Sequence, residues 1–115
     1  MVMDATTHAR FEARTRILKA LAHPSRLFMV EELSRGERCV RELTEMVGAD
    51  MSTVSKHLSL LRSAGIVAVE KRGMQVYYRL KTPCVLRFFD CIGEVIEHSA
   101  REQNELVSIG RRTRK

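Results

Sequence analysis

The chain has 115 residues, 30% of them charged and 44% hydrophobic, with a formal net charge of +6 at pH 7. This length suits one compact domain and excludes a multidomain enzyme, and the surplus of 20 basic over 14 acidic residues suits a polyanionic partner such as nucleic acid. No stretch approaches the roughly 18 apolar residues of a membrane-spanning helix, and the first residues lack a basic region followed by an apolar core. We therefore expect a cytoplasmic protein that does not span a membrane.

Two helices are predicted at the start of the chain. The first carries Phe11, Leu18 and Leu21 on one stripe. Pro24 suits the first turn of the second helix, because its missing N–H would have no partner there, and Gly36 follows the end of that helix.

Two further helices and a hairpin are predicted next. The two helices are marked by apolar residues at helical spacing, namely Val40, Leu43, Val47, Val54, Leu58 and Leu61. Gly48 ends the third helix, and Asp50 is placed to cap the fourth, which runs to Gly65. The apolar period then changes from helical to alternating, which predicts a β-hairpin, the wing, over about residues 66–80 with its turn at 72–74.

A long last helix is expected over about residues 83–109, ahead of a basic tail at 110–115. Thr82 and Pro83 are placed as its N-cap and first-turn proline. The helix is apolar around so much of its surface that we expect a second copy of the chain to cover it. A homodimer is therefore predicted.

Two helices joined by a glycine-containing turn and followed by a hairpin with a basic tip form the order of a winged helix-turn-helix. The expected fold is mainly α with a β-hairpin wing: four helices, two strands and a helix in one domain over residues 1–115, dimerised through its terminal helices. Small hydroxyl groups and cations on the fourth helix suit the major groove of DNA, and wing cations suit the flanking phosphates. The predicted contacts to double-stranded operator DNA are Ser52, Thr53, Ser55, Lys56, His57, Arg62, Lys71 and Arg72. Taken singly, such features are usually only solvated, so this interpretation depends on their joint order.

Four runs carry a resemblance to a known family: residues 21–27 (LAHPSRL), 39–43 (CVREL), 52–67 (STVSKHLSLLRSAGIV) and 75–80 (QVYYRL). From about residue 15 to residue 98 the chain resembles the ArsR/SmtB family of metal-sensing transcriptional repressors, most of all its arsenic-responsive type. The resemblance implies a homodimeric winged-helix repressor of a metal(loid)-resistance operon that leaves its operator when an inducer binds. It implies no permanently bound cofactor, and it places base contacts on the helix that holds residues 52–57.

The inducer sites familiar in that family are incomplete in this sequence. Cys39 stands where arsenic-responsive members have the first cysteine of a Cys-Val-Cys motif, but Arg41 stands in place of the second. The metal-binding pairs of zinc-type members are also missing, since Asp90 is followed two residues later by Ile92 rather than histidine. Neither site is therefore carried over.

The remaining thiols, Cys84 and Cys91, share a helical stripe with His98 at spacings of seven residues. Soft thiolates select thiophilic ions, so Cys39, Cys84 and Cys91 are the candidate metal ligands, and arsenite or a related metal(loid) ion is the expected inducer. In a regular helix the Cα atoms of Cys84 and Cys91 lie ~10.5 Å apart along the axis, beyond the ~9 Å that two thiolates on one ion can span. Either the first turn at residues 83–84 unwinds, or one cysteine pairs with Cys39 or with the partner chain.

Alternatives remain at this point. The cysteines could respond to oxidants or reactive sulfur by forming a disulfide or polysulfide link, or Cys91 could simply pack in a core. The chain could also be a winged-helix interaction protein that senses no ligand. An enzyme is not expected, because the sequence lacks a nucleophile elbow, a phosphate loop and a paired-cysteine zinc motif, and because Ser55 and His57 point away from each other on a helix.

Overall fold

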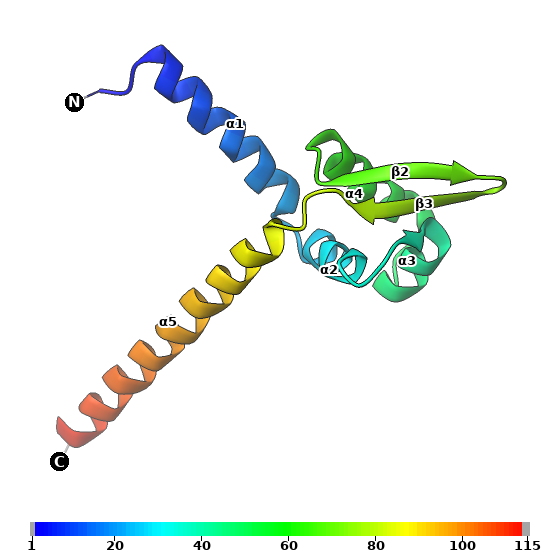
Figure 1. Cartoon of the computed structure of the whole chain (residues 1–115). Coiled ribbons are helices and arrows are strands. Elements are labelled where there is room, and N and C mark those ends of the chain that lie inside the picture. The colour runs from blue at the N-terminus through cyan, green and yellow to red at the C-terminus, as the bar shows by residue number, and fades with distance from the viewer. Residues whose placement is uncertain (1, 114–115) are drawn as a thin grey trace. The chain divides into compact units, whose positions relative to one another are not determined.

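The computed structural model describes residues 2–113 and the side chains of residues 2–107. Its elements in chain order are α1 (Ala5–Leu21), α2 (Pro24–Leu33), β1 (Arg38–Cys39), α3 (Val40–Val47), α4 (Met51–Ser63), β2 (Val67–Arg72), β3 (Gln75–Leu80) and α5 (Val85–Thr113) (Figure 1). The chain divides into two compact units, Met1–Pro83 and Cys84–Lys115. Within the described part, no helix is both long and apolar enough to cross a membrane.

The helices of the first unit begin and end where local sequence directs them. The side chains of Asp4, His23 and Asp50 each accept a backbone N–H at the start of α1, α2 and α4. Pro24 occupies the first turn of α2, and Gly48 ends α3 in the left-handed conformation with φ of 76°. The predicted mainly helical fold with a hairpin wing is confirmed.

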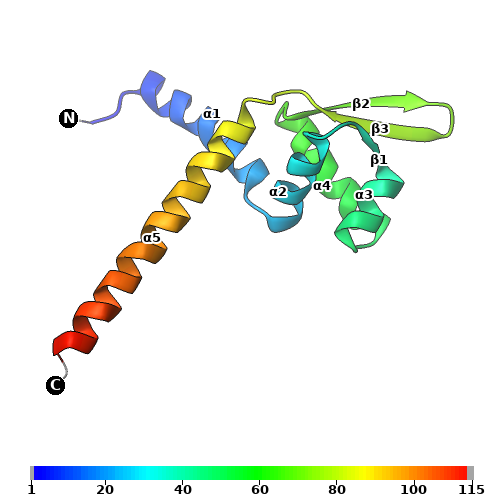
Figure 2. The same cartoon turned by 60° about the horizontal axis from the view of Figure 1, so that its bottom comes forward.

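The wing is an antiparallel hairpin of β2 and β3 in which Val67 pairs with Leu80 and Arg72 pairs with Gln75. Gly73, at φ of 61°, supplies the left-handed backbone that the tight turn needs. Two residues that the sequence analysis did not predict as a strand form β1, which pairs with the other edge of β3 and gives the sheet order β1-β3-β2. In Figures 1 and 2 the tip of the hairpin projects beyond α3 and α4.

A small apolar core lies between the helices of the first unit. Its completely buried side chains come from α2, α3 and α4, and they are Met29, Val30, Leu43, Val54, Leu58 and Leu61. Ile66, Val67 and Tyr78 extend this core to the sheet. The same apolar stripe that predicted α4 thus holds one face of this helix inside the unit and leaves the opposite face in solvent.

The second unit consists of α5 and the residues beside it. The helix begins at Val85 rather than at Pro83 as predicted, and at its start the Arg87 N–H donates to the Cys84 carbonyl at 3.2 Å in a tighter three-residue turn. It continues to Thr113, past the expected end at residue 109, and the side chains of the predicted basic tail at 110–115 lie outside the described residues. None of the described α5 side chains is buried in the single chain.

Candidate nucleic-acid interface

The first turn of α4 is held by Asp50. Its Oδ1 atom accepts the Thr53 N–H at 2.7 Å and the Ser52 hydroxyl at 2.8 Å. These hydrogen bonds, with the Thr53 N–H contributing most, lower the pKa of Asp50 to about 2. The cap keeps the backbone of the first turn in place, while the side chains of Ser52 and Thr53 remain exposed.

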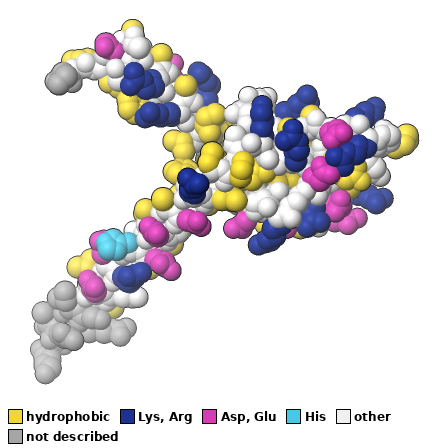
Figure 3. All heavy atoms as spheres, in the orientation of Figure 1, with side chains coloured by type: hydrophobic (Ala, Val, Ile, Leu, Met, Phe, Trp, Pro, Cys, Tyr) yellow, Lys and Arg dark blue, Asp and Glu magenta, His cyan; other side chains and the backbone are white. Residues whose placement is uncertain are grey.

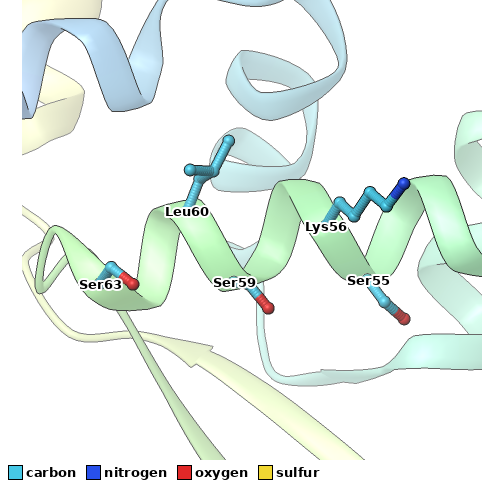
Figure 4. Close-up of a pocket in the computed structure, with 5 residues that line it drawn as sticks. All are labelled: Ser55, Lys56, Ser59, Leu60 and Ser63. Atoms are coloured by element: carbon cyan, nitrogen blue, oxygen red, sulfur yellow. The ribbon is translucent and has the colours of Figure 1, made fainter.

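The outward face of α4 is polar and open. Five residues line a shallow surface hollow there, namely Ser55, Lys56, Ser59, Leu60 and Ser63. Figure 4 shows the three serines pointing to one side of the helix, and Lys56 and Leu60 pointing to the other. Short hydroxyl side chains let a helix approach base edges closely, and a neighbouring cation can reach a phosphate. Sequence analysis singled out Ser55 and Lys56, whereas Ser59 follows one turn later on the same face.

His57 is placed differently from the other predicted contacts of α4. Its side chain is half-buried, with Nδ1 at 2.9 Å from Nη1 of Arg26 and its ring centroid 4.3 Å from that of His23. Helical spacing explains the partial burial of His57, because this residue lies only about 60° around the helix from the buried Val54. The structure therefore brings His57 to α2 rather than to the outward serine face.

The two predicted contacts near the tip of the wing, Lys71 and Arg72, differ in their surroundings. Lys71 is exposed and forms no ion pair with the described residues. Arg72 donates to both carboxylate oxygens of Glu37, at 2.6 and 3.1 Å, and to Glu70 at 2.7 Å, and it stacks over the Tyr77 ring at 4.8 Å. The bonds to Glu37 and Glu70 raise the pKa of Arg72 and keep it charged.

Acidic partners thus offset part of the charge at the wing. Figure 3 shows acidic side chains beside Lys and Arg over the hairpin region. Glu37 lies 35 residues from Arg72 in the chain, so no local pattern in the sequence announced this pairing. The remaining predicted contact, Arg62, belongs to α4 rather than to the wing. It is exposed in the final turn of that helix.

The three cysteines are free thiols in two different settings. Cys39 is 4% exposed at the start of α3, where its N–H donates to Glu42 at 3.1 Å, and it belongs to the first unit. Cys84 and Cys91 are exposed and belong to the second unit, with Cys84 in the turn that precedes α5. Among the residues that the structure describes, no group of three or more His, Cys, Asp or Glu side chains is arranged to hold a metal ion. His98 lies 3.6 Å from Glu102 on the exposed surface of α5.

Residues 23–69 match the family model of bacterial regulatory proteins of the arsR family. The HTH-type transcriptional repressor SmtB of Mycobacterium tuberculosis is 41% identical over 69 residues, which are 60% of this chain and 51% of SmtB. The chain thus spans about half the length of this curated relative.

Solved structures match over a larger share of the chain. The crystal structure of NolR from Sinorhizobium fredii has a TM-score of 0.76 at 27% identity and covers 83% of this chain and 95% of NolR. A homodimeric winged helix-turn-helix DNA-binding domain from Mycobacterium bovis, a possible ArsR-family transcriptional regulator, has a TM-score of 0.71 at 30% identity over 84% of this chain and 90% of that domain. SmtB is a transcriptional repressor and the Mycobacterium bovis domain is a possible transcriptional regulator, in agreement with the expectation that the chain is not an enzyme.

Proposed function

Because the chain belongs to the ArsR family of bacterial regulatory proteins, we propose that it is a homodimeric transcriptional repressor that binds double-stranded operator DNA through α4 and the wing. The observation that carries this proposal is the exposed hydroxyl face of α4, held in place by the Asp50 cap and by a buried apolar stripe on its opposite side. Such a helix can enter a major groove while the rest of the unit stays outside it.

The proposed contacts divide by chemistry. Ser52, Thr53 and Ser55 read base edges, since hydroxyl groups both donate and accept there. Lys56, Arg62 and the wing cations bind phosphates, which contribute affinity without reading sequence. Lys71 is the stronger wing contact, because a phosphate must compete with Glu37 for Arg72. His57 supports α4 from inside the unit.

We propose that α5 supplies the dimer contact. Val95, Ile96 and Leu106 lie on the broad apolar side of this helix and are each more than half exposed in the single chain. In Figure 3 hydrophobic side chains follow one edge of α5, and charged side chains lie beside them. A stripe of this kind is stable in water when a second helix covers it.

For the inducer, we propose a thiophilic metal(loid) ion such as arsenite, bound through Cys84 and Cys91. Both thiols are exposed in the same unit, and Cys84 lies in the turn directly ahead of α5, so one ion can bind both thiols when this turn unwinds and shortens the ~10.5 Å separation of a regular helix. Cys39 is the third candidate ligand, although its burial requires α3 to open before its thiol can bind an ion. Binding that reshapes the start of the dimer helix would change the spacing of the two α4 helices on DNA.

A second inducer class follows from a different observation. The described residues contain no preformed metal cluster, and two exposed thiols can instead be linked by an oxidant or by reactive sulfur. A disulfide or polysulfide between cysteines on separate helices, or between Cys84 and Cys91 once the start of α5 unwinds, would release the repressor by the same change in α5.

The test is fluorescence anisotropy of the reduced protein on DNA from its own promoter, titrated with arsenite, then cadmium or zinc, then a polysulfide. Each titration is repeated with Cys84→Ser and Cys91→Ser, with Cys39→Ser as the buried comparison. Release by arsenite that Cys84→Ser and Cys91→Ser each abolish supports the metal(loid) sensor, and release by polysulfide alone supports the thiol switch. Absence of salt-dependent DNA binding would contradict the repressor itself.

A further inference from the structure

One guanidinium group connects three helices of the first unit. Arg26 of α2 donates through Nε to the Ala20 carbonyl at 2.7 Å and through Nη2 to the Lys19 carbonyl at 3.4 Å. Both carbonyls lie in the last turn of α1, where the Lys19 oxygen also accepts the Ala22 N–H at 3.3 Å and the Ala20 oxygen has no N–H partner within the helix. The third nitrogen, Nη1, lies 2.9 Å from Nδ1 of His57, in the middle of α4. Arg26 therefore caps the end of α1 and holds the DNA-facing helix with the same planar group.

This arrangement specifies the protonation state of His57. A guanidinium has only donors, so Nδ1 of His57 must accept, which requires a neutral imidazole with its proton on Nε2. His23 has the same requirement, because its Nδ1 accepts the Ser25 N–H at 3.0 Å and thereby caps α2. While both hydrogen bonds persist, Arg26 is therefore the only charged group among Arg26, His23 and His57. The two imidazole rings lie 4.3 Å apart.

We propose that Arg26 is the positioning residue that fixes α4 against the end of α1, and that protonation of His57 breaks this contact and weakens operator binding. The inference rests on the proposed DNA-binding function. A proton on Nδ1 would place a second donor and a second positive charge against the guanidinium, at a distance that now suits one hydrogen bond. The DNA-facing helix would lose its attachment to α2, although its apolar stripe would still hold it to the core.

The surroundings of His57 favour the neutral form near pH 7. Burial, then the charges of His23 and Arg26, lower the pKa of His57 below its ordinary value of 6.5. Helix α1, helix α3 and strand β2 also pack against α4, and among the described residues they add no charged or titratable group that acts on His57. The exposed His8 and His98 lie beside Glu12 and Glu102, outside this cluster.

The direction in which pH changes DNA affinity distinguishes the proposed effect of His57 from the general electrostatic attraction between a positive protein and DNA. Protonation of surface histidines at lower pH makes the protein more positive and strengthens its attraction to any DNA. The proposal predicts the opposite for the operator, because each chain must release the His57 proton to place α4 correctly. Below the pKa of His57, the specific binding constant falls by up to about tenfold per pH unit for each chain.

The experiment measures the affinity of the full chain for an operator fragment and for a scrambled fragment, from pH 7.5 down to one unit below the His57 pKa that NMR gives, at constant ionic strength. We expect the ratio of the two affinities to fall with pH in the wild type and in the control His8→Gln, and to stay level in His57→Gln, whose side chain does not titrate. Arg26→Lys keeps the charge but loses the planar fork, so it should lower the ratio on the order of tenfold at pH 7.5. A wild-type ratio that holds or rises as the pH falls through the His57 pKa measured by NMR, or a His57→Gln ratio that falls like the wild type, overturns the proposal.

A second measurement without DNA separates this proposal from the repressor function. Nitrogen-15 NMR of the imidazoles reports the tautomer of His57 and its titration, and amide shifts of α4 report the attachment of the helix. We expect the Nε2–H tautomer at pH 7.5 and α4 shifts that follow the His57 titration and vanish in Arg26→Lys. An Nδ1–H tautomer, or α4 shifts that ignore the titration, refutes the positioning role whether or not DNA is bound. If the NMR result holds and DNA binding fails, the repressor function is wrong and the link between Arg26 and His57 stands.

Discussion

Asp50 determines how α4 begins, both as the acceptor of the Thr53 N–H and as a charged group. Substitution can separate these two roles. Asp50→Ala removes the acceptor of the Thr53 N–H and should lower Tm by roughly 3–6 °C at pH 7, whereas Asp50→Asn keeps a capping oxygen and should lower it less. Because folding lowers the pKa of Asp50 from 3.8 to about 2, its charge contributes stability above about pH 4 that is lost as the pH falls toward 2. Thermal unfolding at pH 7, 4 and 2 checks both effects. Equal acid sensitivity in wild type and Asp50→Asn would contradict the assignment.

The thiol of Cys39 differs from the other two in access to solvent. It is buried at the start of α3, so alkylation requires local opening of the unit, whereas Cys84 and Cys91 are exposed in the chain. We expect iodoacetamide to modify Cys84 more than roughly tenfold faster than Cys39 in the native protein, and the difference to vanish in denaturant. Peptide mass mapping over time gives the rates. Native-state labelling of Cys39 as fast as that of Cys84 would show that Cys39 is accessible to an inducer.

At the scale of elements, the tip of the wing combines Lys71, which forms no ion pair with the described residues, with Arg72, which is paired. Lys71→Ala should lower the slope of log affinity against log salt by about 0.9 per chain, the value for one phosphate contact. Arg72→Ala should change this slope less, because Glu37 and Glu70 already neutralise Arg72. Glu37→Gln should strengthen DNA binding, since it frees Arg72 and removes a carboxylate near the phosphates. Salt titrations of the three variants test this order, and a larger slope change for Arg72→Ala than for Lys71→Ala would reverse it.

Local signals account for what the sequence predicted well. The apolar stripe and Asp50 cap locate α4, and the change of period with Gly73 at its turn locates the wing, because each signal depends on neighbours within a few residues. Strand β1 was missed, since its two residues carry no alternation and exist as a strand only through pairing with β3. The start of α5 was placed two residues early, because Pro83 fits a first turn equally well outside the helix.

The candidate site shows the same limit more sharply. The exposed serines of α4 follow from helical spacing alone, whereas Glu37 lies 35 residues from Arg72 and Arg26 lies 31 residues from His57 in the chain. Sequence could have placed His57 beside the buried stripe of α4, but it could not name Arg26 as its partner. Hydrogen bonds between distant segments are fixed by the fold as a whole, so a pattern of residues cannot reveal them.

At the scale of the whole molecule, repression requires two copies of α4 at a fixed separation. Val95 is 64% exposed on the apolar stripe of α5, so Val95→Glu would place a charge in the proposed dimer contact. We expect this variant to shift toward monomer in size-exclusion chromatography with light scattering and to lose operator affinity by more than about tenfold. Asn104→Glu adds the same charge about 120° away from the centre of that stripe and should leave the dimer intact. A dimeric Val95→Glu protein would remove α5 from the interface.

The symmetry of that dimer makes a claim about DNA. Two recognition helices related by a two-fold axis fit successive major grooves on one side of the duplex, so the operator should be an imperfect inverted repeat with half-site centres about 10 to 11 base pairs, or a multiple, apart. Hydroxyl-radical footprinting on the promoter of the gene that encodes the protein should show two protected segments separated by that distance.

Inserting five base pairs between the half-sites turns one of them by about half a helical turn, so the dimer can then engage only one half-site. Affinity should fall toward that of a single half-site and recover in part when ten base pairs are inserted. Unchanged affinity after the five-pair insertion would mean that each chain binds DNA independently, and the coupling of α5 to α4 would then have no role in release.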